Sequence, residues 1–365
     1  MSQNFSDSIL NWYQNNKRDL PWRVTDDPYR IWVSEIMLQQ TRVDTVIPYY
    51  HRFIETFPTV YKLAKANQQQ VLKCWEGLGY YSRGRNLHQA AQTVVELFSG
   101  EVPSTYEKIT SLKGIGPYTA AAILSIAFQK HYAVVDGNVI RVITRYFGIR
   151  DDIRKSATKK LVQDHVDELI PKNQPGDFNQ AVMELGALIC KPQKPECEKC
   201  PVSAHCIAFR RVETESIPYK SAAKKVPHHQ IAVGLIINKK NELLIALRPN
   251  DSMLGGLWEF PGGKKEKNES LKKTVQRELK EELGVDVEVF DKYRDLKHAY
   301  SHFKITLHAY WCRILNGDPF PKSSQKLKWV SLDEIREFPF PKANKTLIDS
   351  LKKLDDQNLS RFLKR

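Results

Sequence analysis

The sequence contains no long hydrophobic run. None of its 365 residues belongs to a stretch approaching the ~18 apolar residues of a membrane-spanning helix. The opening residues, MSQNFSDSILNWYQNN, also lack the basic segment and apolar core of a secretory signal. We therefore expect a cytoplasmic protein that has no membrane partner.

Acidic residues are scarce relative to basic ones. The chain has 42 Asp and Glu against 56 Lys and Arg, which gives a net charge of +14. A surplus of this size favours a polyanionic partner such as DNA or RNA over an acidic metabolite. The plain alternative is a soluble protein that is merely basic, and charge alone does not exclude it.

The length and the hydrophobic pattern predict two domains with a linker between them. Residues 1–216 place apolar residues at spacings of three and four, as in PYRIWVSEIMLQQ, which predicts amphipathic helices. Residues 217–229, IPYKSAAKKVPHH, contain three lysines and two prolines but no acid, and we expect an exposed basic linker. In residues 230–365 the period becomes two, as in FKITLHAYWCR, around a helix at SLKKTVQRELKEEL. The predicted fold is multidomain, with an all-α domain followed by an α+β domain.

Four of the six cysteines crowd into 17 positions with the spacing C-x6-C-x2-C-x5-C. In a reducing compartment such crowding indicates metal ligation rather than disulfides. Four thiolates can hold a zinc ion or a 4Fe–4S cluster. Zinc sites more often contain two C-x2-C pairs, so the single pair here favours the cluster. The candidate ligands are Cys190, Cys197, Cys200 and Cys206.

The stretch LKGIGPYTAA contains Gly114 and Gly116 but lacks the third glycine, at position 119, of a dinucleotide-binding fingerprint. The preceding STYEKITSL begins with Ser104 and has Glu107 three residues later, which predicts a helix-capping box. A helix, a tight Gly-x-Gly turn and a second helix direct backbone N–H groups toward an anion. In so basic a chain we expect that anion to be a nucleic-acid phosphate.

Two acidic residues lie in apolar surroundings. Glu35 is inside the helix predicted for IWVSEIMLQQ, where burial would raise its pKa and keep a proton available. Asp136 follows an apolar run and precedes a glycine in VVDGNV. The ordinary alternatives are a solvated glutamate and a helix-capping aspartate.

Together these features resemble the helix-hairpin-helix DNA glycosylases, and the cysteine spacing is similar to that of their iron–sulfur loop. The stretches PWR, SEIMLQQT, GLGYYSR and VDGNVIRV resemble the MutY family of adenine DNA glycosylases, and the resemblance covers essentially the whole chain. It implies a 4Fe–4S cofactor and a double-stranded DNA partner with adenine opposite 8-oxoguanine or guanine. It also implies a monomeric bacterial enzyme that acts at the nucleoid.

The resemblance assigns roles to the residues around the reacting bond. Glu35 would protonate the flipped adenine and then assist the water, while Asp136 would stabilise the oxocarbenium-like sugar. Tyr118 and Asn138 would position these groups. In the bifunctional branch of the superfamily position 118 is a lysine that forms a Schiff base, and Lys113 lies on the wrong side of the turn to replace it. We therefore expect hydrolysis without strand cleavage.

Other motif residues resemble DNA-contacting positions of the family. Gln40 and Tyr80 would fill the gap that the flipped base leaves and wedge open the DNA double helix. Trp22 and Arg23 resemble residues of the adenine pocket, although a packed surface aromatic is a close alternative for the Trp-Arg pair.

The segment GKKEKNESLKKTVQRELKEELGV, residues 263–285, fits the Nudix pattern G-x5-E-x7-R-E-U-x-E-E-x-G-U at every fixed position. Glu278, Glu281 and Glu282 fall on one helix face and could bind Mg²⁺ for pyrophosphate hydrolysis. The resemblance instead implies a Nudix (MutT)-like domain that reads 8-oxoguanine, with Ser301 in YSH as the contacting residue. Nucleotide hydrolysis stays open.

Two other functions compete with this interpretation. A bifunctional lyase that carries a Nudix hydrolase should have lysine at position 118. A non-enzymatic iron–sulfur protein that binds DNA or senses redox state would not need both Glu35 and Asp136. The residues at these three positions favour the monofunctional glycosylase.

Overall fold

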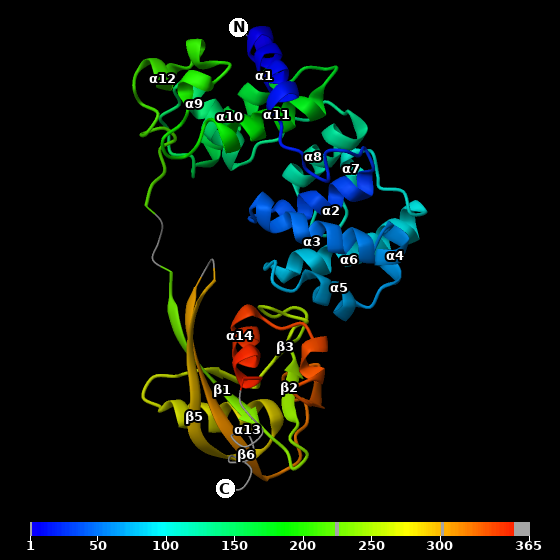
Figure 1. The fold of residues 1–365 in the computed structure, drawn as a ribbon, viewed down its shortest axis with the longest axis vertical. Coiled ribbons are helices and arrows are strands. Elements are labelled where there is room, and N and C mark those ends of the chain that lie inside the picture. Colours follow the sequence, from blue (N-terminus) through cyan, green and yellow to red (C-terminus); the bar gives the residue numbers. More distant parts are fainter. Residues whose placement is uncertain (1, 223–225, 301–302, 354–365) are drawn as a thin grey trace. The chain divides into compact units, whose positions relative to one another are not determined.

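The computed structural model describes residues 2–222, 226–300 and 303–353. The chain divides into two compact units, of which the first comprises residues 1–65 and 86–223 and the second residues 66–85 and 224–365. In the parts described, the first unit is helical and the second combines helices with strands (Figure 1), which confirms the predicted fold class. None of the described helices is both long enough and apolar enough to cross a membrane.

The described part of the first unit contains helices and 3-10 turns. The helices are α1 (Ser2–Asn16), α2 (Pro28–Leu38), α3 (Val43–Thr56), α4 (Val60–Lys65), most of α6 (Tyr81–Phe98), α7 (Tyr106–Thr110), α8 (Pro117–Phe128), α9 (Gly137–Phe147), α10 (Ser156–Leu169), α11 (Pro175–Leu188) and α12 (Ile207–Arg210). Two 3-10 turns, Cys197–Lys199 and Ser203–His205, precede α12.

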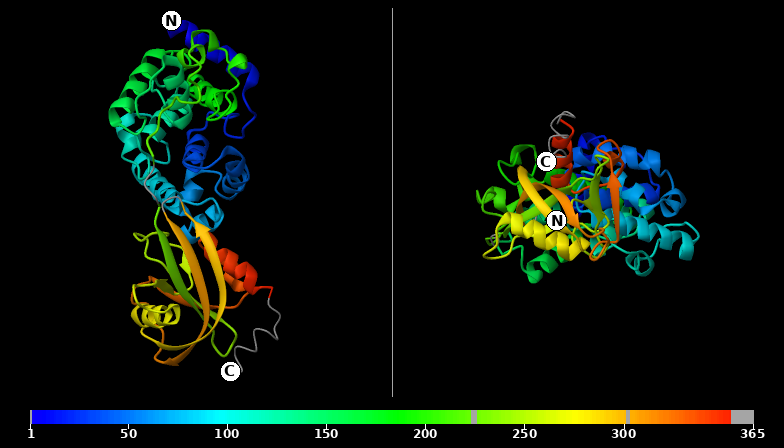
Figure 2. Two further views of the ribbon diagram at one scale, coloured as in Figure 1. Left: turned by 90° about the vertical axis from the view of Figure 1, so that its left-hand side faces the viewer. Right: turned by 90° about the horizontal axis from the view of Figure 1, so that it is seen from below.

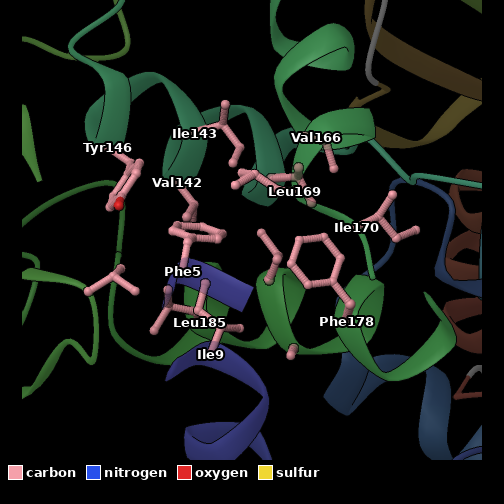
Figure 3. Packing of buried hydrophobic residues seen from close by; sticks show 14 of the residues in the cluster. Phe5, Ile9, Val142, Ile143, Tyr146, Val166, Leu169, Ile170, Phe178 and Leu185 are labelled. Carbon is pink, nitrogen blue, oxygen red and sulfur yellow. The ribbon is translucent and has the colours of Figure 1, made fainter. Parts of the chain in front are cut away.

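A hydrophobic core joins α1, α9, α10 and α11. Phe5 and Ile9 lie on one face of α1, since they are four residues apart, and both are fully buried. Figure 3 shows Phe5 among side chains of the other helices, and its ring meets the Tyr146 ring edge-on, with 4.6 Å between centroids. This core fixes α9 and α11, which both contribute to the site described below.

The predicted hairpin is formed by α7, a turn and α8. Gly114 has a left-handed backbone (φ 82°), and a Cβ there would lie 2.7 Å from Cβ of Asn86, so only glycine fits. The helix before the glycines is confirmed, but the capping box predicted to start at Ser104 is wrong. Thr105 is the N-cap, and it makes no side-chain cap hydrogen bond. Gly116 is the N-cap of α8 in extended conformation, and a Cβ there would have free space.

The second unit contains two sheets. The first has the order β4 (Gly262–Lys264), β1 (His228–Ile236), β6 (Lys304–Asn316), β5 (Asp286–Ala299), and the second has the order β3 (Trp258–Glu259), β2 (Leu243–Leu247), β7 (Lys326–Val330). Strand β1 pairs in parallel with β6 and antiparallel with β4. The strands predicted from the period-two pattern and the helix predicted between them are therefore confirmed.

Helices α13 (Leu271–Leu283) and α14 (Lys342–Leu351) cover opposite faces of the four-stranded sheet, as Figure 2 shows. Val275 and Leu279 of α13 pack against β1 and β6, whereas Leu347 and Ile348 of α14 belong to the cluster on the other face. A 3-10 turn, Glu334–Glu337, precedes α14.

Residues 66–85, with α5 (Gln68–Trp75), belong to the second unit although they lie early in the chain. Within that unit, Nε1 of Trp258 donates to Oε1 of Gln69 at 3.0 Å. The carboxylate of Glu76 accepts from the Phe340 N–H at 3.0 Å and pairs with Nζ of Lys345 at 3.0 Å. The second unit is therefore built from two separate parts of the chain.

Candidate active site

A cavity of about 380 Å³ lies in the first unit, where α2, the start of α3, α8, the N-terminus of α9 and α11 contribute side chains to its wall. Six of the residues predicted from the sequence line this cavity together: Trp22, Arg23, Glu35, Tyr118, Asp136 and Asn138. The predicted residues Gln40, Tyr80, Gly114 and Gly116 do not line it.

Glu35 is delivered to the cavity by α2, an apolar helix that begins at Pro28 and is capped by the side chain of Asp27. Only 6% of Glu35 is exposed. Burial raises its pKa to about 7, and the negative charge of Asp136 adds to the rise, while a hydrogen bond from Tyr118 and the charge of Arg23 oppose it. A substantial fraction of Glu35 is therefore protonated near neutral pH, which is what a general acid needs.

Asp136 is the N-cap of α9, so the predicted alternative of a capping aspartate holds as well. Its Oδ1 accepts from the Val139 N–H at 2.7 Å, and its Oδ2 accepts from Nδ2 of Asn138 at 2.9 Å. Burial raises the pKa of Asp136, and these hydrogen bonds oppose the rise. The cap fixes the direction of the carboxylate while leaving it on the cavity wall.

Tyr118 lies in the first turn of α8 and is a neighbour of both carboxyl groups. Its hydroxyl is 3.6 Å from Sδ of Met183 and also donates to Glu35. Burial and the charges of Glu35 and Asp136 raise the pKa of Tyr118 well above its usual value, so the hydroxyl stays neutral.

Glu184 on α11 was not predicted, yet it lines the same cavity. Only 1% of its side chain is exposed, and it pairs with Arg18 and Arg23 at 2.6 and 2.9 Å. Burial alone would raise the pKa of Glu184, but the hydrogen bonds from both arginines lower it to about 2. A signal was present in the sequence, because Glu184 is the acidic residue inside the apolar run AVMELGALIC.

The environment of Trp22 excludes the surface-aromatic alternative. Trp22 is buried, and its ring meets Tyr50 edge-on with 5.4 Å between centroids. Arg23 is held beside it, with its guanidinium 5.4 Å from the centroid of the Tyr13 ring. The pair therefore forms part of the cavity wall.

Gln40 and Tyr80, the predicted wedge residues, share an unusual backbone. Both have positive φ, 57° and 48°, a conformation that costs free energy for residues other than glycine. At Tyr80 the backbone is held from both sides, since Nε1 of Trp75 and Nη2 of Arg83 both donate to the Gly79 carbonyl at 3.1 Å. Gln40 belongs to the first unit and Tyr80 to the second.

The four predicted cysteine ligands occupy one loop, and none forms a disulfide. Burial raises the pKa of Cys200 to about 12, and the nearby Cys190, Cys206 and Cys197 thiols add to the rise. Nη1 of Arg145 donates to Sγ of Cys190 at 3.4 Å. In the described part of the chain no group of His, Cys, Asp or Glu is arranged to hold a metal ion.

The Nudix-type carboxylates of the second unit are engaged with protein partners. Arg277 pairs with Glu269, Glu278 and Glu281 at 2.9–3.1 Å. Glu282 accepts from the Gly262 N–H at 3.0 Å, and burial followed by the charge of Glu259 raises the pKa of Glu282 to about 8. Ser301 lies outside the described residues.

Two protein-family models match the chain. The model of the HhH-GPD superfamily of base excision DNA repair proteins matches residues 33–172, and the NUDIX domain model matches residues 232–350. The first match includes Glu35, Tyr118 and Asp136.

The chain is similar along most of its length to curated proteins named adenine DNA glycosylase. It is 35% identical to that of Homo sapiens, with 91% of this chain and 71% of the human protein covered. It is 33% identical to that of Buchnera aphidicola subsp. Acyrthosiphon pisum (strain APS), with 96% and 98% covered. A solved thermostable thymine-DNA glycosylase matches with a TM-score of 0.52 and 33% identity, covering 57% of this chain and 95% of that one.

Proposed function

This chain belongs to the adenine DNA glycosylase family, enzymes of base-excision repair that bind DNA, and we propose that it hydrolytically removes adenine opposite 8-oxoguanine or guanine. The observation that carries the proposal is the pair Glu35 and Asp136, which share one cavity but have different partners. Burial raises the pKa of Glu35 to about 7 despite Tyr118 and Arg23. The hydrogen bonds from Val139 and Asn138 and the charge of Arg141 favour the charged form of Asp136. These environments suit Glu35 to act as the proton donor and Asp136 to act as the carboxylate.

The first proposed step is proton transfer to the base. Adenine leaves the stack at a cost of a few kcal/mol and enters the cavity. Glu35 donates its proton to a ring nitrogen as the N-glycosidic bond breaks, and the bonding electrons leave with the base. Glu35 is then a carboxylate, and it accepts a proton from the water that attacks the sugar.

Asp136 acts on the sugar in this mechanism. Bond cleavage leaves positive charge on the sugar ring, and an oriented carboxylate in a buried site stabilises such charge strongly. The hydrogen bonds from Val139 and Asn138 hold Asp136 in place before the reaction, so little reorganisation is needed. The neutral hydroxyl of Tyr118 orients Glu35 and cannot form an imine, so the strand is not cut.

The cysteine loop is proposed to hold a 4Fe–4S cluster. Cys190, Cys197, Cys200 and Cys206 come close enough for each thiol to affect the others electrostatically. Their spacing contains a single C-x2-C pair, whereas zinc sites more often contain two, and this supports a cluster over one tetrahedral ion. When bound, the cluster supplies redox-capable iron and cross-links the loop, and hydrolysis requires neither electron transfer nor Lewis-acid chemistry from it.

We propose that residues 230–365 read the base opposite adenine through Ser301 and that residues 1–216 carry out catalysis in a monomer. Residues 217–229 are proposed as the linker, although its last two residues already pair with β6 as the start of β1. A reader is needed because adenine is a normal base, and its removal everywhere would damage the genome. The NUDIX match over residues 232–350 supports a dedicated domain.

The test is incubation with a duplex that carries one adenine opposite 8-oxoguanine, assayed for free base and for strand breaks. We expect free adenine, intact strands before alkali treatment, and no substantial adduct after borohydride reduction. Efficient trapping and strand cleavage by the wild type would instead assign the protein to the lyase branch.

A further inference from the structure

We infer that Glu184 is a positioning residue that clamps Arg18 and Arg23 in the cavity wall and balances the charge that faces Glu35. The inference rests on the proposed function, because it concerns the acid of that reaction. It adds a residue that does not itself exchange a proton with the substrate.

The clamp is formed by five hydrogen bonds to one carboxylate. Arg18 donates its backbone N–H and Nε to Oε1 at 2.9 Å each, and its Nη2 to Oε2 at 2.6 Å. Arg23 donates Nη1 to Oε1 at 3.0 Å and Nη2 to Oε2 at 2.9 Å. Each guanidinium thus contacts both oxygens of Glu184, and this bidentate geometry fixes the plane of the guanidinium. The side chain of Arg23 is only 10% exposed, so water does not compete strongly for it.

Without Glu184 little else would fix the direction of Arg23. Among the described residues, its remaining polar contact is a 3.2 Å hydrogen bond from Nη1 to the Arg18 carbonyl, and its guanidinium also lies over the Tyr13 ring. Both arginines line the cavity together with Glu35. Loss of Glu184 would therefore free two cationic side chains inside the site that must accept a neutral purine.

Glu184 also controls the electrostatic balance around Glu35. The positive charge of Arg23 acts to lower the pKa of Glu35. Glu184 is ionised throughout the neutral range and so offsets that charge. The titratable and charged side chains that share the cavity wall with Glu35 are Arg18, Arg23, Arg42, Asp44, Tyr118, Asp136 and Glu184. Removing the carboxylate makes this set more positive by one charge.

The test is the pH profile of single-turnover adenine release from the full chain. In Glu184→Gln the alkaline limb, where Glu35 loses its proton, should move to lower pH by ~0.3–1 unit because the added positive charge favours the carboxylate. The rate at pH 6 should fall ~10- to 100-fold because the arginines are misplaced. Glu184→Asp keeps the charge, so it should lower the rate while leaving the limb in place.

Two further variants separate charge from packing. Glu184→Gln combined with Arg23→Gln restores the net charge of the cavity, so its alkaline limb should return toward that of the wild type even though the rate stays low. Glu213→Gln is the matched control, since it breaks the Arg150 ion pair of the same unit, and Glu213 does not line the cavity. Its profile should match the wild type. An unmoved limb in Glu184→Gln, or an equal shift in Glu184→Asp, would overturn the inference.

Unfolding experiments at a series of pH values, without substrate, test this inference separately from the proposed function. The increase in unfolding free energy caused by Glu35→Gln should grow with pH and level off at the pKa of Glu35. In the Glu184→Gln background it should level off at lower pH. A wild type that releases no adenine, combined with that shift, would refute the proposed reaction alone. An unchanged levelling point would refute the clamp.

Discussion

Each unit contains a glutamate with a raised pKa: Glu35 is buried, with a pKa of about 7, and Glu282 is partly buried, with a pKa of about 8. The two differ in what surrounds them. Glu35 lines a cavity that also holds Asp136 and Tyr118. Glu282 accepts from the Gly262 N–H, and its neighbours are carboxylates already paired with arginine. A raised pKa therefore does not by itself identify an acid catalyst. A cavity and a second group with a complementary task are also required.

The largest expected difference between the two glutamates is in catalysis. Glu35→Gln keeps the shape of the side chain but removes the proton, so single-turnover adenine release should fall by ~10²–10⁴-fold. Glu282→Gln is the matched control and should leave the rate within about threefold, because Glu282 belongs to the second unit and does not line the cavity. DNA binding by both variants, measured by fluorescence anisotropy, should persist. A comparable loss of adenine release in Glu282→Gln would show that the two glutamates do not differ in their role in catalysis.

The same two variants should differ in how stability depends on pH. A carboxyl group whose pKa is raised by folding destabilises the folded protein as the pH rises from the group's ordinary pKa toward its raised pKa. For Glu35 the rise from 4.5 to about 7 corresponds to about 3 kcal/mol. Glu35→Gln should therefore gain stability over the wild type between pH 4.5 and 7 and remain constant above.

For Glu282→Gln the gain should continue to about pH 8, because that is where its raised pKa lies. Denaturant unfolding of both variants and the wild type at a series of pH values measures the two curves. Curves that level off at the same pH would show that the two sites do not differ electrostatically.

A smaller effect is expected at the proposed reader. Ser301→Ala removes one hydroxyl contact, which is worth ~1–3 kcal/mol when it discriminates between bases. The ratio of adenine-release rates opposite 8-oxoguanine and opposite guanine should fall about tenfold, with the rate opposite guanine unchanged. Glu35→Gln should instead lower both rates by the same factor. An unchanged ratio in Ser301→Ala would remove Ser301 from the recognition of the opposite base.

The smallest effect is expected from magnesium. Arg277 pairs with Glu269, Glu278 and Glu281 and so occupies their oxygens, and Glu282 is largely protonated below pH 8. A hard cation needs ionised oxygens that are free to bind it, so millimolar Mg²⁺ at pH 7 should shift the melting temperature by less than about 1 °C. Nucleoside triphosphates should survive incubation with the protein. Their hydrolysis, abolished by Glu278→Gln, would revive the hydrolase interpretation.

Much of the fold could be predicted because local patterns and packing agree. The pattern of the apolar residues located α2, α13 and the long strands. Helix α13 buries one face, whereas most of α2 and β6 is buried. The site residues Glu35, Tyr118 and Asp136 were found through motifs, and the cavity brings them together. Glu184 was missed although it is an acidic residue inside an apolar run, because its role depends on two arginines more than 160 positions away. No local pattern encodes such a contact.

Helix boundaries and unit boundaries were harder to predict. The sequence favoured Ser104 as a cap, but Thr105 occupies that position, because neighbouring hydroxyl residues compete for one cap. The membership of residues 66–85 in the second unit depends on bonds such as those of Gln69 with Trp258 and Glu76 with Phe340. These bonds join residues far apart in the sequence and leave no periodic signal.

The discontinuity of the second unit has a consequence for the time course of synthesis on the ribosome. Residues 66–85 leave the ribosome before residue 224 is made, and 138 residues lie between the two segments of that unit. At ~5–20 residues per second the interval lasts roughly 7–28 s. During it Gln69 and Glu76 have no Trp258, Phe340 or Lys345 to bond with. The nascent chain therefore passes through a stage in which α5 lacks its contacts with the rest of the second unit. A chaperone that binds exposed helices could bind α5 during this interval.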